Sequence, residues 1–243
     1  MSVINKTTQC SFLTVLLMLC IMPECLLSQV RGMTQTMAEN KTGTIRLPDP
    51  LQDSDTSIEA ALLARRSVRS YQDGPLTRAE ISQLLWAAQG ITSPRGLRSA
   101  PSAGALYPLE MYVVAGNVDD LPDGVYKYGP EKHDLTGLAE GDKRKELCSA
   151  ALGQTSVRNA AAVIVISAVY ERTTAKYGER GIQYVHMESG HAAQNIFLQA
   201  VPLNIGTVVI GAFYDEAVKK VLKMPEREQP LYIMPAGRIK QEP

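Results

Sequence analysis

An uninterrupted apolar run over residues 160–169 sets the architecture expected of this chain. Its middle, residues 163–166, reads Val-Ile-Val-Ile. Side chains that branch at Cβ favour strands, and a short continuous apolar run is typical of a strand buried on both faces. The run therefore predicts a sheet that lies under helices.

Helical and strand patterns alternate along the rest of the chain, but not as a regular series of βαβ units. Helices are predicted over residues 57–66, 77–89, 142–152, 180–201 and 215–222. Strands are predicted over residues 110–115, 124–128 and 231–235, with a short strand or a loop over 206–213. We therefore predict an α+β fold with a mostly antiparallel sheet packed by helices.

The N-terminal segment resembles a targeting sequence. Lys6 precedes an apolar run over residues 12–22, which is short for a spanning helix, and a buried helix of the fold is the alternative. We assign residues 1–28 to a signal-like or anchor segment, 29–55 to a polar linker and 56–240 to the folded domain. The protein is then expected to be exported, to the periplasm or medium, or anchored to a membrane by its N-terminus, while a cytoplasmic location stays open.

Charge and cysteine content exclude several classes of protein. Lys and Arg together number 25, as do Asp and Glu, so the formal net charge is zero. A neutral chain lacks the basic field that attracts nucleic acid, and we expect no nucleic-acid partner. A membrane contact is expected only through the N-terminal segment, if that segment is not cleaved. Three of the four cysteines lie within the first 25 residues, so Cys148 stands alone in the domain and no disulfide framework can form there.

Two histidines of the long predicted helix do not suit a metal. His186 and His191 are five residues apart, so their directions differ by roughly 140° around a helix. Zinc-protease helices place histidines four residues apart on one face. No metal site is predicted.

A dense cationic segment, Arg65-Arg66-Ser67-Val68-Arg69-Ser70-Tyr71, follows the first predicted helix. Guanidinium groups match the geometry of phosphate oxygens, and serine adds a small donor. The segment indicates a site for an anionic ligand. The alternative is a solvated helix end whose cations favour the helix dipole.

Three further segments could approach a flat ligand. Residues 101–108 hold small side chains between two prolines, and small side chains let backbone amides come close to a ligand. Residues 206–213 combine apolar residues with glycine, and residues 237–238 add a glycine and a cation. Considered singly, these segments also fit a surface loop, a buried strand that ends in a turn, and a solvated tail.

These segments occur together in an order that resembles a known family. The chain contains Arg-Arg-Ser-x-Arg, Pro-Ser-Ala-Gly-Ala-x-Tyr-Pro-x-Glu, His-x-Glu-x-Gly-His-x-x-Gln-Asn, Val-x-Ile-Gly-x-Phe and Pro-x-Gly-Arg motifs. The set resembles the nitroreductase-like FMN oxidoreductases, closest to the SagB-type dehydrogenase branch, over roughly residues 55–240. The resemblance implies a nitroreductase-like fold and a domain-interlocked homodimer that binds FMN at the subunit interface.

The resemblance also implies roles for individual positions. Contacts to the FMN phosphate and ribityl chain are implied for Arg65, Arg66, Ser67 and Arg69, with Arg238 adding to the phosphate grip. An approach to the flavin ring, from the partner subunit, is implied for Pro101, Ser102, Ala103, Gly104, Ala105 and Leu106. Positions near the pyrimidine edge and the reactive nitrogen are implied for Val209, Ile210 and Gly211. The family often has proline at the position of Val209 and glycine at that of Ala212.

Three functions are compatible with this sequence. The first is an FMN-dependent oxidoreductase that transfers hydride between NAD(P)H or an organic substrate and a nitro or quinone acceptor. The second is an azoline or heterocycle dehydrogenase acting on a peptide or small molecule, in which Lys176 and Tyr177 are catalytic and supply a base; an exposed loop pair is the alternative for these two residues. The third is a flavin-binding protein without turnover. No Gly-x-Gly-x-x-Gly motif follows a predicted strand, so NAD(P)H would bind only transiently.

Overall fold

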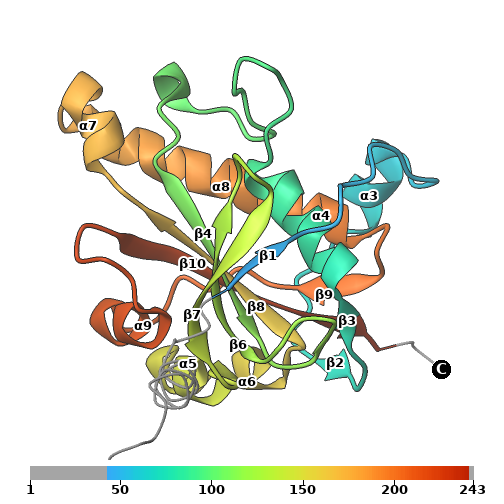
Figure 1. The fold of residues 1–243 in the computed structure, drawn as a ribbon. Helices are drawn as coiled ribbons and strands as arrows, with labels where there is room; N and C mark the ends of the chain where they lie inside the picture. The colour runs from blue at the N-terminus through green and yellow to red at the C-terminus, as the bar shows by residue number, and fades with distance from the viewer. Residues whose placement is uncertain (1–42, 241–243) are drawn as a thin grey trace, which may run out of the picture. The chain divides into compact units, whose positions relative to one another are not determined.

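An antiparallel sheet with helices on both faces forms the structure, a computed structural model that describes residues 43–240 (Figure 1). The strand order is β1-β7-β6-β4-β8-β10-β2, with β9 paired to β10, and each of these pairs is antiparallel. The strands of this sheet are β1 (Thr44–Arg46), β2 (Tyr71–Gln72), β4 (Leu109–Ala115), β6 (Gly124–Gly129), β7 (Asp134–Glu140), β8 (Ala162–Ala168), β9 (Ile205–Thr207) and β10 (Gln229–Ile239). A separate parallel pair joins β3 (Leu76–Thr77) to β5 (Val118–Asp119). The predicted α+β class with a mostly antiparallel sheet is confirmed.

Helices cover the two faces of the sheet. They are α3 (Ile58–Ala64), α4 (Arg78–Gln89), α5 (Arg144–Ala150), α6 (Thr155–Asn159), α7 (Glu171–Tyr177), α8 (Arg180–Ala200) and α9 (Asp215–Leu222), with a 3₁₀ turn, η1 (Ala103–Ala105). Figure 1 shows α4 and α8 on one side of the strands and α5, α6 and α9 on the other. Among residues 43–240, no helix combines the length and apolarity that a membrane span needs.

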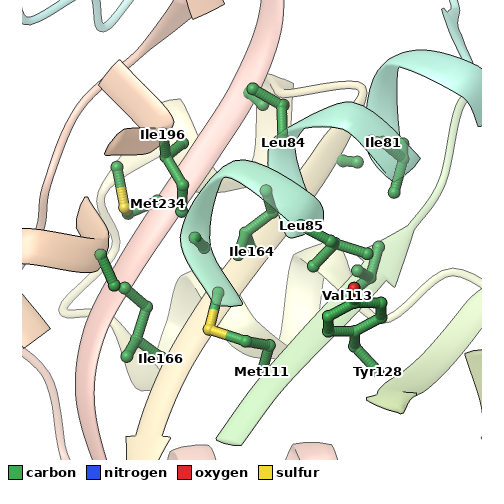
Figure 2. Close-up of a cluster of buried hydrophobic side chains, with 14 of the residues drawn as sticks. Ile81, Leu84, Leu85, Met111, Val113, Tyr128, Ile164, Ile166, Ile196 and Met234 are labelled. Atoms are coloured by element: carbon green, nitrogen blue, oxygen red, sulfur yellow. The ribbon is translucent and has the colours of Figure 1, made fainter. Parts of the chain in front are cut away.

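Strand β8 lies between the two helical layers and contributes side chains to both, because all seven of its residues are buried. Val163 and Val165 face the core under α5, α6 and α9, while Ile164 and Ile166 face the core under α4 and α8. In the close-up of the second core, Ile164 and Ile166 lie with side chains from α4, α8 and neighbouring strands (Figure 2). The predicted central apolar run therefore serves both faces, as strand alternation requires.

Local capping signals fix where two helices begin. The Ser57 hydroxyl accepts a hydrogen bond from the Ala60 amide and caps α3. Thr77 and Glu80 form a reciprocal capping box at the start of α4. Both starts agree with the sequence prediction, because each cap depends only on residues three apart.

The linker prediction for residues 29–55 is wrong over part of its length. Thr44–Arg46 is a strand paired with β7, and Leu47 is 2% exposed in the core under α4 and α8. A three-residue strand is too short to show a period, so the polar composition around it dominated the prediction. The signal-like or anchor segment over residues 1–28, and residues 29–42 of the linker, lie outside the described residues.

Candidate functional site

The cationic segment runs beside strand β9. Arg65 caps the C-terminus of α3, after which the chain passes β9: Ser67 bridges Thr207, and the Val68 amide donates to the Thr207 carbonyl at 2.9 Å. A Cβ on Gly206 would lie 2.6 Å from Val68 Cγ1, so this close approach needs glycine. Two segments predicted as a site, residues 65–69 and 206–211, are therefore neighbours.

Side chains of the cationic segment differ in how they are held. The Arg65 guanidinium lies 5.1 Å from the Phe197 ring centroid, and Arg66 donates to the Leu63 carbonyl at 2.9 Å. Arg69 is exposed and forms no ion pair within residues 43–240. The Thr207 hydroxyl is buried and has no hydrogen-bond partner among the described residues. An anion at this position would meet the exposed cations Arg66 and Arg69.

Arg238 is held by a partner of its own. It lies on β10 opposite Gln72, and its guanidinium donates to Glu80 Oε1 at 2.6 Å and Oε2 at 2.8 Å, and to the Pro75 carbonyl at 3.0 Å. Burial raises the pKa of Glu80, but the hydrogen bonds from Arg238 and Thr77 outweigh it and lower that pKa overall. Arg238 is thus part of the sheet and not a solvated tail, and a phosphate would have to share it with Glu80.

The loop of small residues has an unusual backbone. Three of its residues have positive φ: 64° at Gly104, 53° at Ala105 and 47° at Tyr107. Only glycine adopts this region without strain, so the two other residues must be held there by their surroundings. Gly104 and Ala105 are exposed, as expected of residues that approach a ligand.

Lys176 and Tyr177 lie directly against this loop. A Cβ on Gly104 would be 2.8 Å from the Tyr177 hydroxyl and 3.0 Å from Lys176 Nζ. The ammonium of Lys176 is also 5.3 Å from the Tyr177 ring centroid. Both residues end helix α7, rather than lying in a loop. The structure therefore brings together two of the predicted site segments that are about 70 residues apart in the chain.

A buried carboxyl group lies beneath the loop. The Ser102 hydroxyl donates to Glu188 Oε2 at 2.6 Å and accepts from the Tyr107 amide at 2.9 Å. Glu188 is 2% exposed, and its Oε1 has no partner among the described residues. Burial raises the pKa of Glu188 to about 7, against smaller opposing effects of Ser102 and Arg98.

Sequence reasoning did not assign Glu188 a role. The available signal was its place on the apolar face of α8, three residues after Val185 and four before Ala192, both fully buried. A carboxyl at such a position has to find a partner in the interior.

Val209, Ile210 and Gly211 continue from β9. Ile210 is 5% exposed and exchanges two backbone hydrogen bonds of 2.9 Å with Ile233 of β10. Val209 is half-buried, and Gly211 is exposed. This segment is thereby fixed to the sheet, and Gly211 is exposed just beyond the paired Ile210.

The two halves of the predicted site lie at different points of helix α8. The cationic segment contacts α8 at Phe197 and the loop contacts it at Glu188, nine residues or about 13 Å apart along the axis. Within residues 43–240 no hydrogen bond or ion pair joins the cationic segment to the loop.

A cleft of about 580 Å³ opens on the sheet beside the loop, and Leu106 and Tyr107 form part of its wall. Charged residues of both signs also line it, namely Arg98, Glu110, Lys127, Glu131 and Arg172. All five are in ion pairs: Lys127 contacts Glu110 at 3.1 Å, Arg172 also pairs with Glu110, and Arg98 contacts Glu131 at 3.4 Å. The cleft suits a polar ligand.

Among residues 43–240, no group of three or more His, Cys, Asp or Glu side chains could hold a metal ion.

Comparisons with known proteins point to one family. The sequence model of the nitroreductase family matches residues 62–238. A candidate nitroreductase from Methanocaldococcus jannaschii is 48% identical over 197 residues, which cover 81% of this chain and 97% of that protein. A crystal structure of a candidate nitroreductase from Anabaena variabilis has a TM-score of 0.72 and 32% identity over 82% of this chain, and the match spans 42% of that chain. The Escherichia coli microcin synthetase McbBCD complex with truncated pro-MccB17 contains a chain with a TM-score of 0.63 and 25% identity, covering 84% of this chain and 80% of that one.

Proposed function

The chain belongs to the nitroreductase family, and from that premise we propose that it is an FMN-dependent oxidoreductase that works as a homodimer. The family and its oxidoreductase members place it among the flavin oxidoreductases in general. FMN, the electron donor, the acceptor and the dimer are the parts that we propose.

The exposed cations beside β9 carry the proposal. Arg69 and Ser67 are both exposed. Together they would bind the FMN phosphate, since guanidinium and hydroxyl donors match its oxygens. Bound FMN would supply hydride transfer. The exposed backbone at Gly104, Ala105 and Gly211 would orient the ring.

The separation of these two halves supports the proposed homodimer. In one chain they contact α8 about 13 Å apart, so we propose that the loop of one subunit completes the site that contains the cationic segment of the other. NAD(P)H or an organic substrate would then deliver hydride, and a nitro compound or quinone would accept it.

An absorbance spectrum with anaerobic addition of NADH or NADPH tests this proposal. We expect flavin bands, release of FMN on denaturation, and bleaching by one of the two donors. Arg69→Ala should purify with much less FMN, whereas Arg158→Ala, an exposed arginine on α6, should retain it. A protein that neither contains nor takes up FMN would contradict the proposal. A flavin that binds but is not reoxidised by added acceptors would favour the flavin-binding protein without turnover.

Lys176 and Tyr177 support a second candidate function, the dehydrogenation of an azoline or another heterocycle. The Tyr177 hydroxyl and Lys176 Nζ lie 2.8 Å and 3.0 Å from the position that a Cβ on Gly104 would occupy. Gly104 belongs to the loop that we expect to reach the flavin. A lysine or tyrosine there could accept the proton while hydride leaves. The likeness to a chain of the microcin synthetase complex supports this candidate as well.

Two variants separate the candidates. If the second candidate holds, Lys176→Ala and Tyr177→Phe should retain FMN but lose turnover of an azoline-containing peptide. If the first holds alone, both variants should oxidise NAD(P)H with a quinone acceptor at the wild-type rate.

A further inference from the structure

Glu188 is a buried acidic group that the proposed reaction leaves unused. It projects from α8 beneath the 101–107 loop, and one of its oxygens accepts from Ser102 at 2.6 Å. Its other oxygen has no partner among residues 43–240, although the residue is only 2% exposed. Burying a carboxyl in this way is costly, so a stabilising role for the core alone does not explain it.

The Ser102 hydroxyl links Glu188 to the strained part of the loop. A hydroxyl has one hydrogen, and here Glu188 receives it, which leaves the lone pairs of Ser102 Oγ for the Tyr107 amide at 2.9 Å. The Ser102 carbonyl also accepts from the Ala105 amide at 3.0 Å. The bonds of this one serine therefore enclose Gly104, Ala105 and Tyr107, the three loop residues with positive φ.

The far end of the loop is held separately. Arg172 donates to the Tyr107 carbonyl at 3.0 Å, and the Tyr107 hydroxyl accepts from the Arg98 amide at 3.2 Å. These contacts fix Tyr107 from the side of the cleft. The Glu188–Ser102 pair is what ties the near end to helix α8.

We propose that Glu188 is a positioning residue that holds the 101–107 loop, through Ser102, in the conformation that presents its backbone to the flavin. The link to flavin rests on the proposed function, but the link to the loop does not. A carboxylate accepts from Ser102 through Oε2, and the carbonyl oxygen of the neutral acid or the amide oxygen of glutamine can accept the same bond more weakly. An alanine at this position leaves the Ser102 hydroxyl without its acceptor.

Hydrogen exchange on the full chain, with and without FMN, tests the loop directly. In Glu188→Ala and in Ser102→Ala we expect the Ala105 and Tyr107 amides to exchange about tenfold faster or more, because a buried hydrogen-bond partner is lost. The dissociation constant for FMN should rise by a similar factor. Glu188→Gln should restore both values to near wild type, and Glu226→Gln, an exposed glutamate far from the loop, should change neither.

The outcomes distinguish this inference from the proposed function. Unchanged exchange at Ala105 and Tyr107 in both alanine variants overturns the positioning role, whatever the affinity for FMN. If the alanine variants exchange faster but the wild type itself binds no FMN, the positioning role is supported and the proposed function is refuted. Because Ser102 is only half-buried, its alanine variant remains informative if Glu188→Ala does not fold.

Discussion

At the scale of single residues, Glu188 should make stability depend on pH in an unusual direction. Its pKa is raised by burial from 4.5 to about 7, so the folded protein binds its proton more tightly than the unfolded chain does. The stabilisation that protonated Glu188 contributes is then fully present below about pH 4.5 and is lost as the pH rises through about 7. Relative to Glu188→Gln, the wild type should lose up to about 3 kcal/mol over this range. Urea denaturation of both proteins at several pH values measures the difference; parallel curves would contradict the prediction.

Gly104 allows a second test at this scale. Gly104→Ala places a methyl group at a φ of 64°, 2.8 Å from the Tyr177 hydroxyl. The strain should cost about 1 kcal/mol of unfolding free energy, and the contact should displace Tyr177 and Lys176 and lower any turnover that uses them. Gly96→Ala is a matched control, because Gly96 has a φ of 78° and no atom within 4 Å of an added Cβ. Denaturation and turnover should show a similar strain cost in both variants and lost turnover only in Gly104→Ala. Equal turnover in Gly104→Ala and Gly96→Ala would mean that Lys176 and Tyr177 do not take part in the reaction.

At the scale of elements, Glu80 joins the start of α4 to the end of β10. Its carboxylate completes the capping box with Thr77 and accepts both bonds from Arg238. Because these bonds lower its pKa, its contribution is present above the unfolded value of 4.5 and is lost as the pH falls further. Glu80→Gln should reduce the unfolding free energy by about 1–3 kcal/mol at pH 7 and flatten the loss in acid. Glu146→Gln on α5 is a matched control, an exposed glutamate in a first helical turn, and should cost under about 0.5 kcal/mol. Chemical denaturation at pH 4 and 7 decides this, and equal losses in both variants would contradict it.

Elements with a strong local pattern could be predicted from the sequence, and those made by pairing could not. The helix over Asp215–Leu222 is predicted to the residue, and its buried Val218 and Leu222 have the four-residue spacing of one helix face. Strand β10 is longer than the predicted 231–235. Pro235 and Gly237 are residues that disfavour a strand locally, but the strand continues through them because it pairs with β8 and β9. The cationic segment and the loop could also be predicted from the sequence, because their residue composition distinguishes them. The contact of Gly104 with Tyr177 depends instead on how α7 packs, and no short-range signal reports it.

At the scale of the whole molecule, the division of the site between two subunits can be tested by mixing variants. Arg65→Ala/Arg69→Ala removes the phosphate side of the site, and Gly104→Leu blocks the loop side, because Gly104 is exposed where the ring is expected. Each variant alone should form dimers that lack FMN and turnover. A two-fold dimer built from one chain of each kind has one site that receives both changes and one site that receives neither.

Unfolding the two variants together in equal amounts and refolding them should therefore restore turnover. Half of the dimers are hybrids and half of the sites in each hybrid are intact, so about one quarter of the wild-type FMN content and activity should return. A site built within a single chain gives no intact copy in any combination, and the mixture would then stay inactive. Refolded wild type sets the scale, and light scattering confirms that each sample is dimeric. Zero recovery in a dimeric mixture would place the loop and the cationic segment of the same chain in one site, which would require the 13 Å between their contacts on α8 to be bridged by the ligand itself.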